Sequence, residues 1–398
     1  MSRIMQTIFY AQSGGVTSVI NQSLVGLIRS ARQHNMRLLV GLDGIHGLLT
    51  ESFFDTASLS EEDLSRIAKT PGGSFGSCRR KLKESDHSQI IHSIKKYSFD
   101  AIIYQGGNDS QSTLNRINQL CLENQISCQT IGLPKTIDND LMETDLCPGF
   151  GSAARFLTLA ARQLCLDLSS MCRDSTKVYI IETMGRHTGW LAASVGLSHQ
   201  KFYPGPQIIL VPERTHSQSD LLSEIEKHVQ NDGYCCICVS EGYSPTNLHN
   251  HQDSFGHATL QGSGLGLKAL IENQCGFKTR LCIPDYLQRS FGLLCSSRDA
   301  QQSYMLGEKA IELLLNGCSG HMITIQRHFD HRDWSFSTAP LATIADKERH
   351  LPLEYLSVDG WTLSDIGRQY FTWALGPDVL QEMDYFWPHI RHHKSCEM

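Results

Sequence analysis

The sequence predicts an α/β protein of two lobes, each with a mainly parallel sheet flanked by helices. Two observations lead to this prediction. Short apolar runs alternate with longer segments of helical period, which is typical of βα units. The 398 residues are also more than one small core needs. We expect a first lobe over residues 1–145, a second over 146–320, and a C-terminal segment over 321–398 that packs back on the lobes.

Eight apolar runs are expected to be strands, because they are short and bounded by polar segments. They span residues 8–11, 37–42, 100–105, 129–133, 177–183, 207–212, 235–241 and 280–284. Five of these runs pass directly into polar turns, most of which contain glycine. In open parallel sheets, ligands bind beyond the carboxyl ends of the strands. We therefore expect these turns to meet at one crevice.

Composition excludes several classes of protein. The net charge of −6 and the 19% of charged residues come without a long basic run, which argues against nucleic acid or a membrane surface as a partner. No apolar stretch is long enough to span a bilayer, and the first apolar run resembles a strand rather than a signal peptide. The 14 cysteines lack paired C-x-x-C spacing, which is typical of reduced thiols. We expect a cytoplasmic protein without disulfides.

The first polar turn holds Gly14 and Gly15 between a strand and a helix. Glycines let the backbone approach an anion, and a helix amino end offers free N–H groups to a phosphate. Taken alone, the pair is more typical of a tight strand-to-helix turn. A second turn with the same geometry, residues 106–110, adds Asn108, Asp109 and Ser110. A carboxylate suits a phosphate site only if a cation bridges it to the phosphate or if it repels an unwanted group. The alternative is that these residues cap a helix.

A third turn, residues 134–140, reads PKTIDND and brings carboxylate, cation and hydroxyl together. A carboxylate can accept the proton of a substrate hydroxyl, while a lysine such as Lys135 neutralises a transferring phosphoryl group. The sequence alone leaves open whether Asp138 and Asp140 do this or form a turn or cap. Further polar residues lie near the ends of later strands, where arginines suit phosphates and Glu241 suits sugar hydroxyls.

With these residues laid out, the chain resembles the bacterial type of the phosphofructokinase family from about Ile8 to about Gly317. The resemblance rests on SGG, PGGSFGSCR, GGNDS, PKTIDND, MGR, SEG and R-x5-Y-x2-R, in the family's order. It implies two α/β lobes with the active site in the cleft between them, and subunits that form dimers or tetramers. It also implies Mg²⁺-dependent phosphoryl transfer to the 1-hydroxyl of fructose 6-phosphate, giving fructose 1,6-bisphosphate. The lobe over 1–145 would bind the donor, and the lobe over 146–320 the sugar phosphate.

The resemblance also implies roles for single residues. Asp138 would be the catalytic base, assisted by Lys135 and Asp109. The residues expected to hold the donor are Gly14, Gly15, Arg79, Gly107 and Ser110. The residues expected to hold fructose 6-phosphate are Thr136, Ile137, Asp138, Lys177, Met184, Gly185, Arg186, Glu241, Arg280, Tyr286 and Arg289. Among them Tyr286 and Arg289 would hold the 6-phosphate, and Arg280 and Lys177 would come from a neighbouring subunit.

Two positions favour pyrophosphate over ATP as the donor. Members that use pyrophosphate carry an acidic residue and a lysine where this chain has Asp109 and Lys135. Asp109 would repel the α-phosphate of ATP, and Lys135 would offset the charge of a donor without adenosine. The common form of the second turn has aspartate at position 108, and Asn108 would meet Mg²⁺ through a neutral oxygen instead. The alternatives are an ATP-dependent enzyme with an unusual turn and a non-catalytic subunit that senses sugar phosphates.

Overall fold

A computed structural model describes residues 6–200, 203–244, 251–252, 258–259, 262–328, 334–376 and 378–383. The chain divides into two compact units. The first unit comprises Met1–Ala153 and Arg289–Arg349, and the second comprises Ala154–Gln288 and His350–Met398. The predicted ranges differ from this division mainly at residues 289–320, which were expected in the second lobe. These residues return to the first unit together with residues 321–349 of the predicted C-terminal segment. The helix and strand hairpin in this segment pack on the first sheet, which explains the return.

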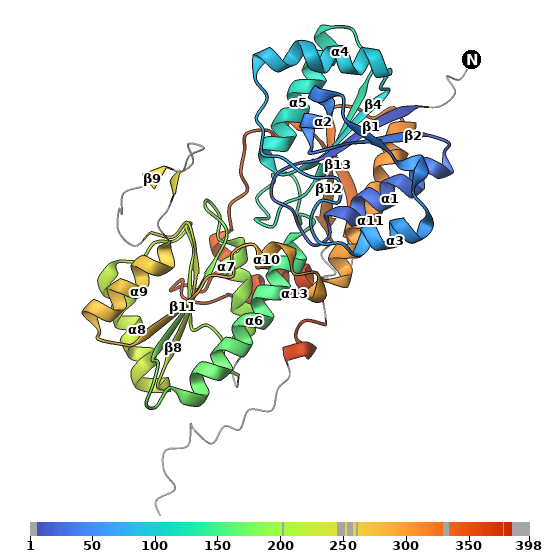
Figure 1. Cartoon of the computed structure of the whole chain (residues 1–398). Coiled ribbons are helices and arrows are strands. Elements are labelled where there is room, and N and C mark those ends of the chain that lie inside the picture. The colour runs from blue at the N-terminus through green and yellow to red at the C-terminus, as the bar shows by residue number, and fades with distance from the viewer. Residues whose placement is uncertain are drawn as a thin grey trace, which may run out of the picture. The chain divides into compact units, whose positions relative to one another are not determined.

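The first unit contains a seven-stranded, mostly parallel sheet (Figure 1). In spatial order its strands are β13 (Trp334–Pro340), β12 (His321–Arg327), β5 (Gln129–Pro134), β4 (Ala101–Gly106), β1 (Thr7–Gln12), β2 (Arg37–Gly41) and β3 (Phe53–Asp55). Only the β12–β13 and β2–β3 pairs are antiparallel. The four predicted strands of this unit are confirmed. The sequence missed β3, β12 and β13, which lie towards the edges of the sheet.

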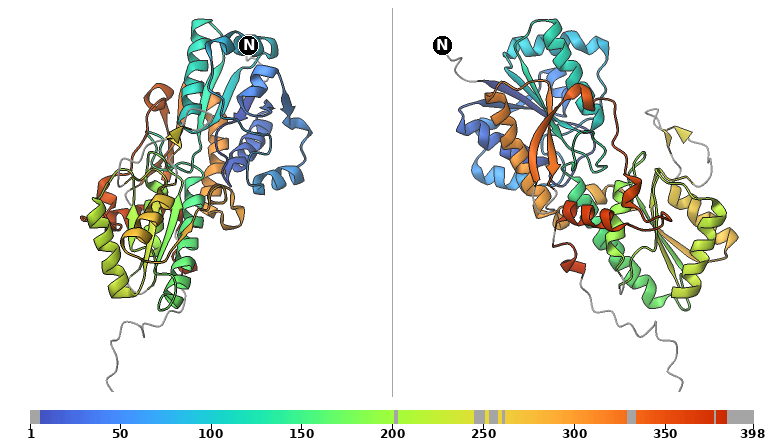
Figure 2. Two further views of the ribbon diagram at one scale, coloured as in Figure 1. Left: turned by 60° about the vertical axis from the view of Figure 1, so that its left-hand side comes forward. Right: turned by 180° about the vertical axis from the view of Figure 1, so that it is seen from behind.

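Helices cover both faces of this sheet (Figures 1 and 2). Ile8 and Tyr10 of β1 pack on one face with α1 (Ile20–Gln33), α3 (Glu61–Lys69) and α11 (Ser297–Leu315). Phe9 and Ala11 pack on the other face. That face is covered by α2 (Ile45–Thr50), α4 (His87–Tyr97), α5 (Asn108–Glu123) and α12 (Leu341–Ile344). Burial on both faces explains why the central strands are apolar runs without alternation.

The order of the strands places a topological switch point between β1 and β4. The chain leaves β1 for β2 on one side and returns to β4 on the other side. Neighbouring crossovers in opposite directions open a crevice at the carboxyl ends of the two strands, where ligands of α/β sheets bind. The two glycine turns follow β1 and β4, so the topology places both at this crevice.

The second unit contains a four-stranded parallel sheet. Its strands, in spatial order, are β11 (Thr279–Cys282), β6 (Val178–Thr183), β8 (Cys235–Ser240) and β7 (Ile208–Leu210). All four were predicted. The longer helices of the unit are α6 (Phe150–Met171), α7 (Trp190–Val195), α8 (Gln218–Asp232), α9 (Ser263–Gln274) and α13 (Asp365–Leu375). A short helix, α10 (Leu287–Ser290), and α6 each cross the division between the units, and β9 (His251–Gln252) and β10 (Ala258–Thr259) form a two-stranded ribbon.

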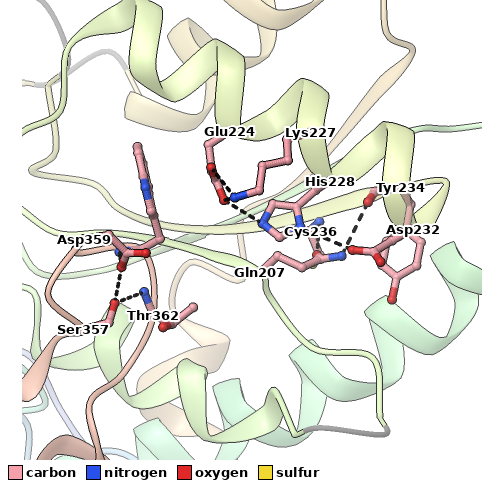
Figure 3. A network of polar contacts seen from close by, with 11 residues as sticks. Gln207, Glu224, Lys227, His228, Asp232, Tyr234, Cys236, Ser357, Asp359 and Thr362 are labelled. Atoms are coloured by element: carbon pink, nitrogen blue, oxygen red, sulfur yellow. Dashed lines mark hydrogen bonds and ion pairs between the residues drawn. The ribbon is translucent and has the colours of Figure 1, made fainter.

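Figure 3 shows polar contacts within α8 and beside the strands of this second sheet. His228 lies between two carboxylates one helical turn away on either side, 3.2 Å from both Glu224 and Asp232. The side-chain oxygen of Gln207 accepts a hydrogen bond from the Cys236 N–H of β8 at 2.7 Å. These contacts belong to the scaffold of the second unit and not to the predicted site.

Composition predicts that the chain has neither disulfides nor membrane-spanning helices. The cysteines that the structure describes form no disulfide with one another. Across the described ranges, no helix is both long enough and apolar enough to cross a bilayer.

Candidate functional site

Three of the five polar turns that were expected to meet do so at the carboxyl ends of β1, β4 and β5 in the first unit. The Ser13 N–H donates a hydrogen bond to the Gln105 carbonyl at 2.8 Å, and the Lys135 N–H donates to the Gly106 carbonyl at 3.1 Å. These bonds tie the first turn to the second and the second to the third. Residues 13–15, 106–110 and 134–140 therefore form one site.

The first glycine turn is bonded to a loop that follows α3. Gly14 has a φ of +76°, which favours glycine. Its N–H donates to the Cys78 carbonyl at 2.8 Å, and its own carbonyl accepts from the Ser77 hydroxyl at 2.8 Å. The backbone of Gly14 therefore holds residues 77–79. The sequence did not predict this contact. Gly15 is the residue of the pair beside which the cationic side chains gather.

Two guanidinium groups lie against Gly15. A Cβ atom on Gly15 would come within 2.8 Å of Arg289 Nη1 and 3.5 Å of Arg79 Nη2. The absence of a side chain at this position therefore leaves room for both arginines. Arg79 was predicted for the donor, and its place here agrees with that prediction. Arg289 was predicted for the sugar 6-phosphate, but in the first unit it lies beside the glycine turn.

Lys135 is almost fully buried, with 2% of its surface exposed. Its ammonium donates to the Ser13 carbonyl at 2.6 Å and to the Gly15 carbonyl at 2.5 Å. Burial, together with the nearby charges of Arg289 and Arg79, lowers the pKa of Lys135 to about 7, against the opposing effect of two aspartates. Three basic side chains thus surround one short turn. Such an arrangement suits a ligand of high negative charge.

The second glycine turn begins α5. A Cβ atom on Gly106 would lie 2.0 Å from the Ser110 hydroxyl, so only glycine fits there. Asp109 lies in the first turn of α5 and is exposed, with its Oδ1 3.0 Å from Lys81 Nζ. Exposed ion pairs are weak, so the Asp109 carboxylate is available to meet a ligand. Gly107 precedes the helix as its N-cap residue.

Asn108 lies next to the acidic end of the third turn. Its Nδ2 donates to Asp140 Oδ2 at 3.0 Å. Its Oδ1 is buried and finds no hydrogen-bond partner among the described residues. Burial raises the pKa of Asp140, and the nearby Glu348 raises it further. The described residues contain no group of three or more His, Cys, Asp or Glu side chains able to hold a metal ion. An unsatisfied amide oxygen beside a carboxylate nevertheless fits Mg²⁺, which takes few protein ligands when a phosphate supplies the others.

The third turn is fastened by a residue that the sequence analysis missed. Asn139 has a φ of +55°, and its Oδ1 accepts from the Cys147 N–H at 2.9 Å. Its carbonyl accepts from Arg349 Nη2 at 2.9 Å, and the Arg349 N–H donates to the Asp140 carbonyl at 2.7 Å. Asp138 lies between these anchors, and its N–H donates to the Thr136 hydroxyl at 3.0 Å. Ile137 is buried beside it. No motif marks Arg349, which lies 210 residues after Asn139.

Four predicted residues of the second unit also meet, at the carboxyl ends of β6 and β8. The Gly185 N–H donates to Glu241 Oε1 at 3.2 Å, and the Met184 N–H donates to the Gln288 side chain at 3.0 Å. Burial raises the pKa of Glu241, while the charge of Arg186 opposes this effect. Arg186 is exposed. Gln288 was not predicted, although it follows Tyr286 by two positions.

Two predicted residues lie elsewhere in the second unit. Lys177 precedes β6, whereas Met184 follows it, so the two stand at opposite ends of one strand. The Lys177 ammonium donates to the Cys172 carbonyl at 2.6 Å and to the Arg173 carbonyl at 3.0 Å, which caps the end of α6. Arg280 is exposed on β11, opposite Tyr179 of β6. Tyr286 follows β11 and is 59% exposed.

A cationic glycine turn beside a pair of carboxylates is the arrangement of a phosphoryl-transfer site. Comparison with known proteins agrees with it. The family model described as phosphofructokinase matches residues 7–314, and the chain belongs to the phosphofructokinase family.

The chain is 40% identical over 377 residues to a pyrophosphate–fructose 6-phosphate 1-phosphotransferase of Xanthomonas campestris pv. campestris, covering 92% of this chain and 90% of that protein. Crystal structures of pyrophosphate-dependent phosphofructokinases are similar too. For that of Nitrosospira multiformis the identity is 34% and the TM-score 0.87, with 93% of this chain and 92% of the other covered. For the structure from Marinobacter aquaeolei the identity is 36% and the TM-score 0.84, again with 93% of this chain and 92% of the other covered.

Proposed function

We propose that the protein transfers a phosphoryl group from pyrophosphate to the 1-hydroxyl of fructose 6-phosphate, giving fructose 1,6-bisphosphate and phosphate. The observation that carries this proposal is the gathering of Lys135, Arg79 and Arg289 around Gly15, in the same unit as Asp138. Three cations in so small a space match the charge of pyrophosphate. The names of the most similar relatives support the same donor and acceptor.

In the proposed reaction, Asp138 accepts the proton of the sugar 1-hydroxyl as the hydroxyl oxygen attacks the terminal phosphorus of pyrophosphate. The bond between that phosphorus and the bridging oxygen breaks, and inorganic phosphate leaves. Lys135, Arg79 and Arg289 stabilise the negative charge of the donor and of the departing phosphate. In the second unit, Glu241 would accept hydrogen bonds from sugar hydroxyls and Arg186 would bind phosphate. The phosphoanhydride of pyrophosphate is closer in hydrolysis free energy to the ester that is formed than the phosphoanhydride of ATP is, so the reaction is reversible.

Magnesium would be held by the Asn108 Oδ1 and the Asp140 carboxylate together with donor oxygens. When bound, the ion would neutralise charge on the donor and orient its phosphates. Arg280 and Lys177 lie away from the carboxyl edge of their sheet, so they would act in the site of a neighbouring copy in a homodimer or homotetramer. The reduced cysteines and the small charged substrates suit a cytoplasmic enzyme.

The reverse reaction tests this function. Purified protein given fructose 1,6-bisphosphate, inorganic phosphate and Mg²⁺ is expected to form pyrophosphate, which ³¹P NMR resolves from the substrates. A non-catalytic sensing subunit would bind the sugar phosphate and form none. Failure to form pyrophosphate in this reverse direction and to consume it in the forward direction would contradict the proposal.

Asp109→Gly tests the exclusion of ATP. Asp109 is exposed at the start of α5, where it would face the α-phosphate of ATP, and like charges placed together cost several kcal/mol. We expect the variant to bind ATP at least about tenfold more tightly than the parent, measured by calorimetry. Asp109→Asn is the matched control, because it removes the charge and keeps the bulk. Equal ATP affinity in all three proteins would show that Asp109 does not exclude the nucleotide.

Asn108→Asp tests the proposed metal site. A second carboxylate beside Asp140 raises the charge of the site, and ligand charge sets the affinity for a divalent cation. The free Mg²⁺ concentration that gives half-maximal activity is expected to fall by roughly threefold or more. Asn115→Asp, two turns further along α5, makes the same chemical change and serves as the control for added charge. A rise or no change in the Mg²⁺ requirement of Asn108→Asp would place the ion elsewhere.

A further inference from the structure

Residues 70–79, which we call the arginine loop, carry Arg79 to the first glycine turn and are anchored on a single amide. Asn21 lies in the first turn of α1 and is fully buried. Its Nδ2 donates to the Thr70 carbonyl at 2.9 Å and to the Gly72 carbonyl at 2.6 Å, and it lies 2.9 Å from the Ser74 hydroxyl. Its Oδ1 accepts from the Ser74 N–H at 3.2 Å. One side chain thus binds three residues of the loop.

Asn21 is itself held by a row of buried polar side chains. Its Oδ1 also accepts from Gln12 Nε2 at 3.2 Å, and the same Nε2 group donates to the Tyr10 hydroxyl at 3.2 Å. The Tyr10 hydroxyl donates in turn to Gln105 Oε1. Burial raises the pKa of Tyr10, so the phenol keeps its proton. The row connects the ends of β1 and β4 with the anchor of the arginine loop.

The other end of the arginine loop lies on the first glycine turn. Cys78 accepts from the Gly14 N–H, and the Ser77 hydroxyl donates to the Gly14 carbonyl. Between its two ends the loop has no helix or strand of its own beyond one bridge, from Cys78 to Ser13. Two backbone hydrogen bonds, from the Gly72 N–H to the Thr17 carbonyl and from the Asp43 N–H to the Phe75 carbonyl, also hold the loop. Among the described side chains, Asn21 contributes the most hydrogen bonds to it.

We propose that Asn21 is a positioning residue, which holds the arginine loop so that Arg79 faces the donor beside Gly15. This inference rests on the proposed function, because it takes the anion beside Gly15 to be the pyrophosphate donor. Asn21 need not touch the donor to act in this way. Its effect on the reaction passes through the arginine loop.

Only an amide satisfies the contacts at this position. Two donors and an acceptor are needed at once, and a neutral amide supplies both. Aspartate would turn an oxygen towards the carbonyls of Thr70 and Gly72, which would repel it and lose their donor. A buried carbonyl without a donor costs about 1–3 kcal/mol. Asn21→Asp is therefore expected to release the loop with almost no change in side-chain volume.

The first test is hydrogen exchange of the loop amides in the full-length protein without substrate. In Asn21→Asp, the amides of residues 72–79 are expected to exchange about tenfold faster or more, whereas those of β1 keep their protection. Asn118→Asp is the matched control, because it makes the same chemical change on α5, away from this loop. Ser74→Ala is a milder second variant that removes one contact. Unchanged loop exchange in both Asn21→Asp and Ser74→Ala would overturn the proposal.

The second test is kinetic. Asn21→Asp is expected to raise the KM for pyrophosphate about tenfold and to leave the KM for fructose 6-phosphate within about twofold. In the Arg79→Ala background, the same change is expected to have less than about a twofold effect, because the arginine that the loop positions is gone. The proposal would be contradicted if the effects of Asn21→Asp and Arg79→Ala on the KM for pyrophosphate were fully additive. It would also be contradicted if Asn21→Asp raised both KM values equally, because either result indicates a general loss of structure. The exchange measurement needs no substrate, so it stays decisive if the proposed donor proves wrong.

Discussion

Asp138→Asn is expected to lower turnover by roughly 10²–10⁴-fold, the usual contribution of a general base. The amide keeps the shape of the side chain and cannot accept the proton of the sugar hydroxyl. Arg349 fastens the neighbouring residues, so the turn should keep its conformation in the variant. The KM for fructose 6-phosphate should therefore change by less than about threefold, since the loss falls on the chemical step. Steady-state kinetics with pyrophosphate measure both quantities.

Asp145→Asn is the matched control for this prediction. Asp145 lies five residues after Asp140 and accepts from the Arg327 N–H at 2.7 Å, so it serves the fold and not the reaction. Its turnover should stay within about threefold of the parent's, as is usual for a residue outside the chemistry. Near-normal turnover in Asp138→Asn would remove Asp138 from the role of base.

Lys135→Met is expected to lower kcat/KM for pyrophosphate by roughly 10²–10³-fold, the cost of losing one preorganised electrostatic contact. Methionine fills the buried space without a charge. It also removes the two hydrogen bonds that the ammonium donates to the Ser13 and Gly15 carbonyls. Lys135→Arg should restore little, because a guanidinium is too large for the buried position. Kinetics with each substrate varied in turn would separate the donor effect from any effect on fructose 6-phosphate.

The same lysine predicts that pyrophosphate binding takes up a proton. With a pKa of about 7, Lys135 is mostly neutral at pH 8 in the empty protein. A bound polyanion raises the pKa of a neighbouring amine and recharges it. Calorimetry at pH 8 in buffers of different ionisation enthalpy should show more proton uptake for the parent than for Lys135→Met. Equal uptake by the two proteins would contradict the assignment of this lysine to the donor site.

The lowered pKa of Lys135 also determines how the stability of the protein changes with pH. The pKa of Lys135 is lowered on folding from 10.5 to about 7, so between these pH values the unfolded chain binds a proton that the folded chain does not. The parent therefore gains stability as the pH rises from 7 to 10.5, relative to Lys135→Met. Below about pH 7 the difference between the two proteins should no longer change with pH. Denaturant unfolding across this range measures it.

The central strands and the turns at their ends could be predicted from the sequence. Strands that are buried on both faces of a sheet are continuous apolar runs, as in residues 101–104. The sequence missed β13, whose residues are mostly only partly buried at the edge of the sheet. The sequence also did not predict that residues 289–349 belong to the first unit, because no local pattern shows that α11 returns to pack on α1.

Within the site, motifs identified the residues that carry charge but not the residues that hold them. Asp138 and Lys135 lie in one turn, so their proximity could be read from spacing. Arg349 and Asn21 act through contacts with segments far away along the chain, and such contacts leave no local pattern. The burial of Lys135 also escaped prediction, since a lysine in a polar turn is normally expected to be solvated.

The identity of the donor is the central claim, and a direct comparison of donors tests it. Purified protein with fructose 6-phosphate and Mg²⁺ would be given pyrophosphate or ATP, and the formation of fructose 1,6-bisphosphate followed for each. We predict that kcat/KM for pyrophosphate exceeds that for ATP by at least about 100-fold, as a charge-based exclusion of several kcal/mol requires. A higher kcat/KM with ATP than with pyrophosphate would contradict it.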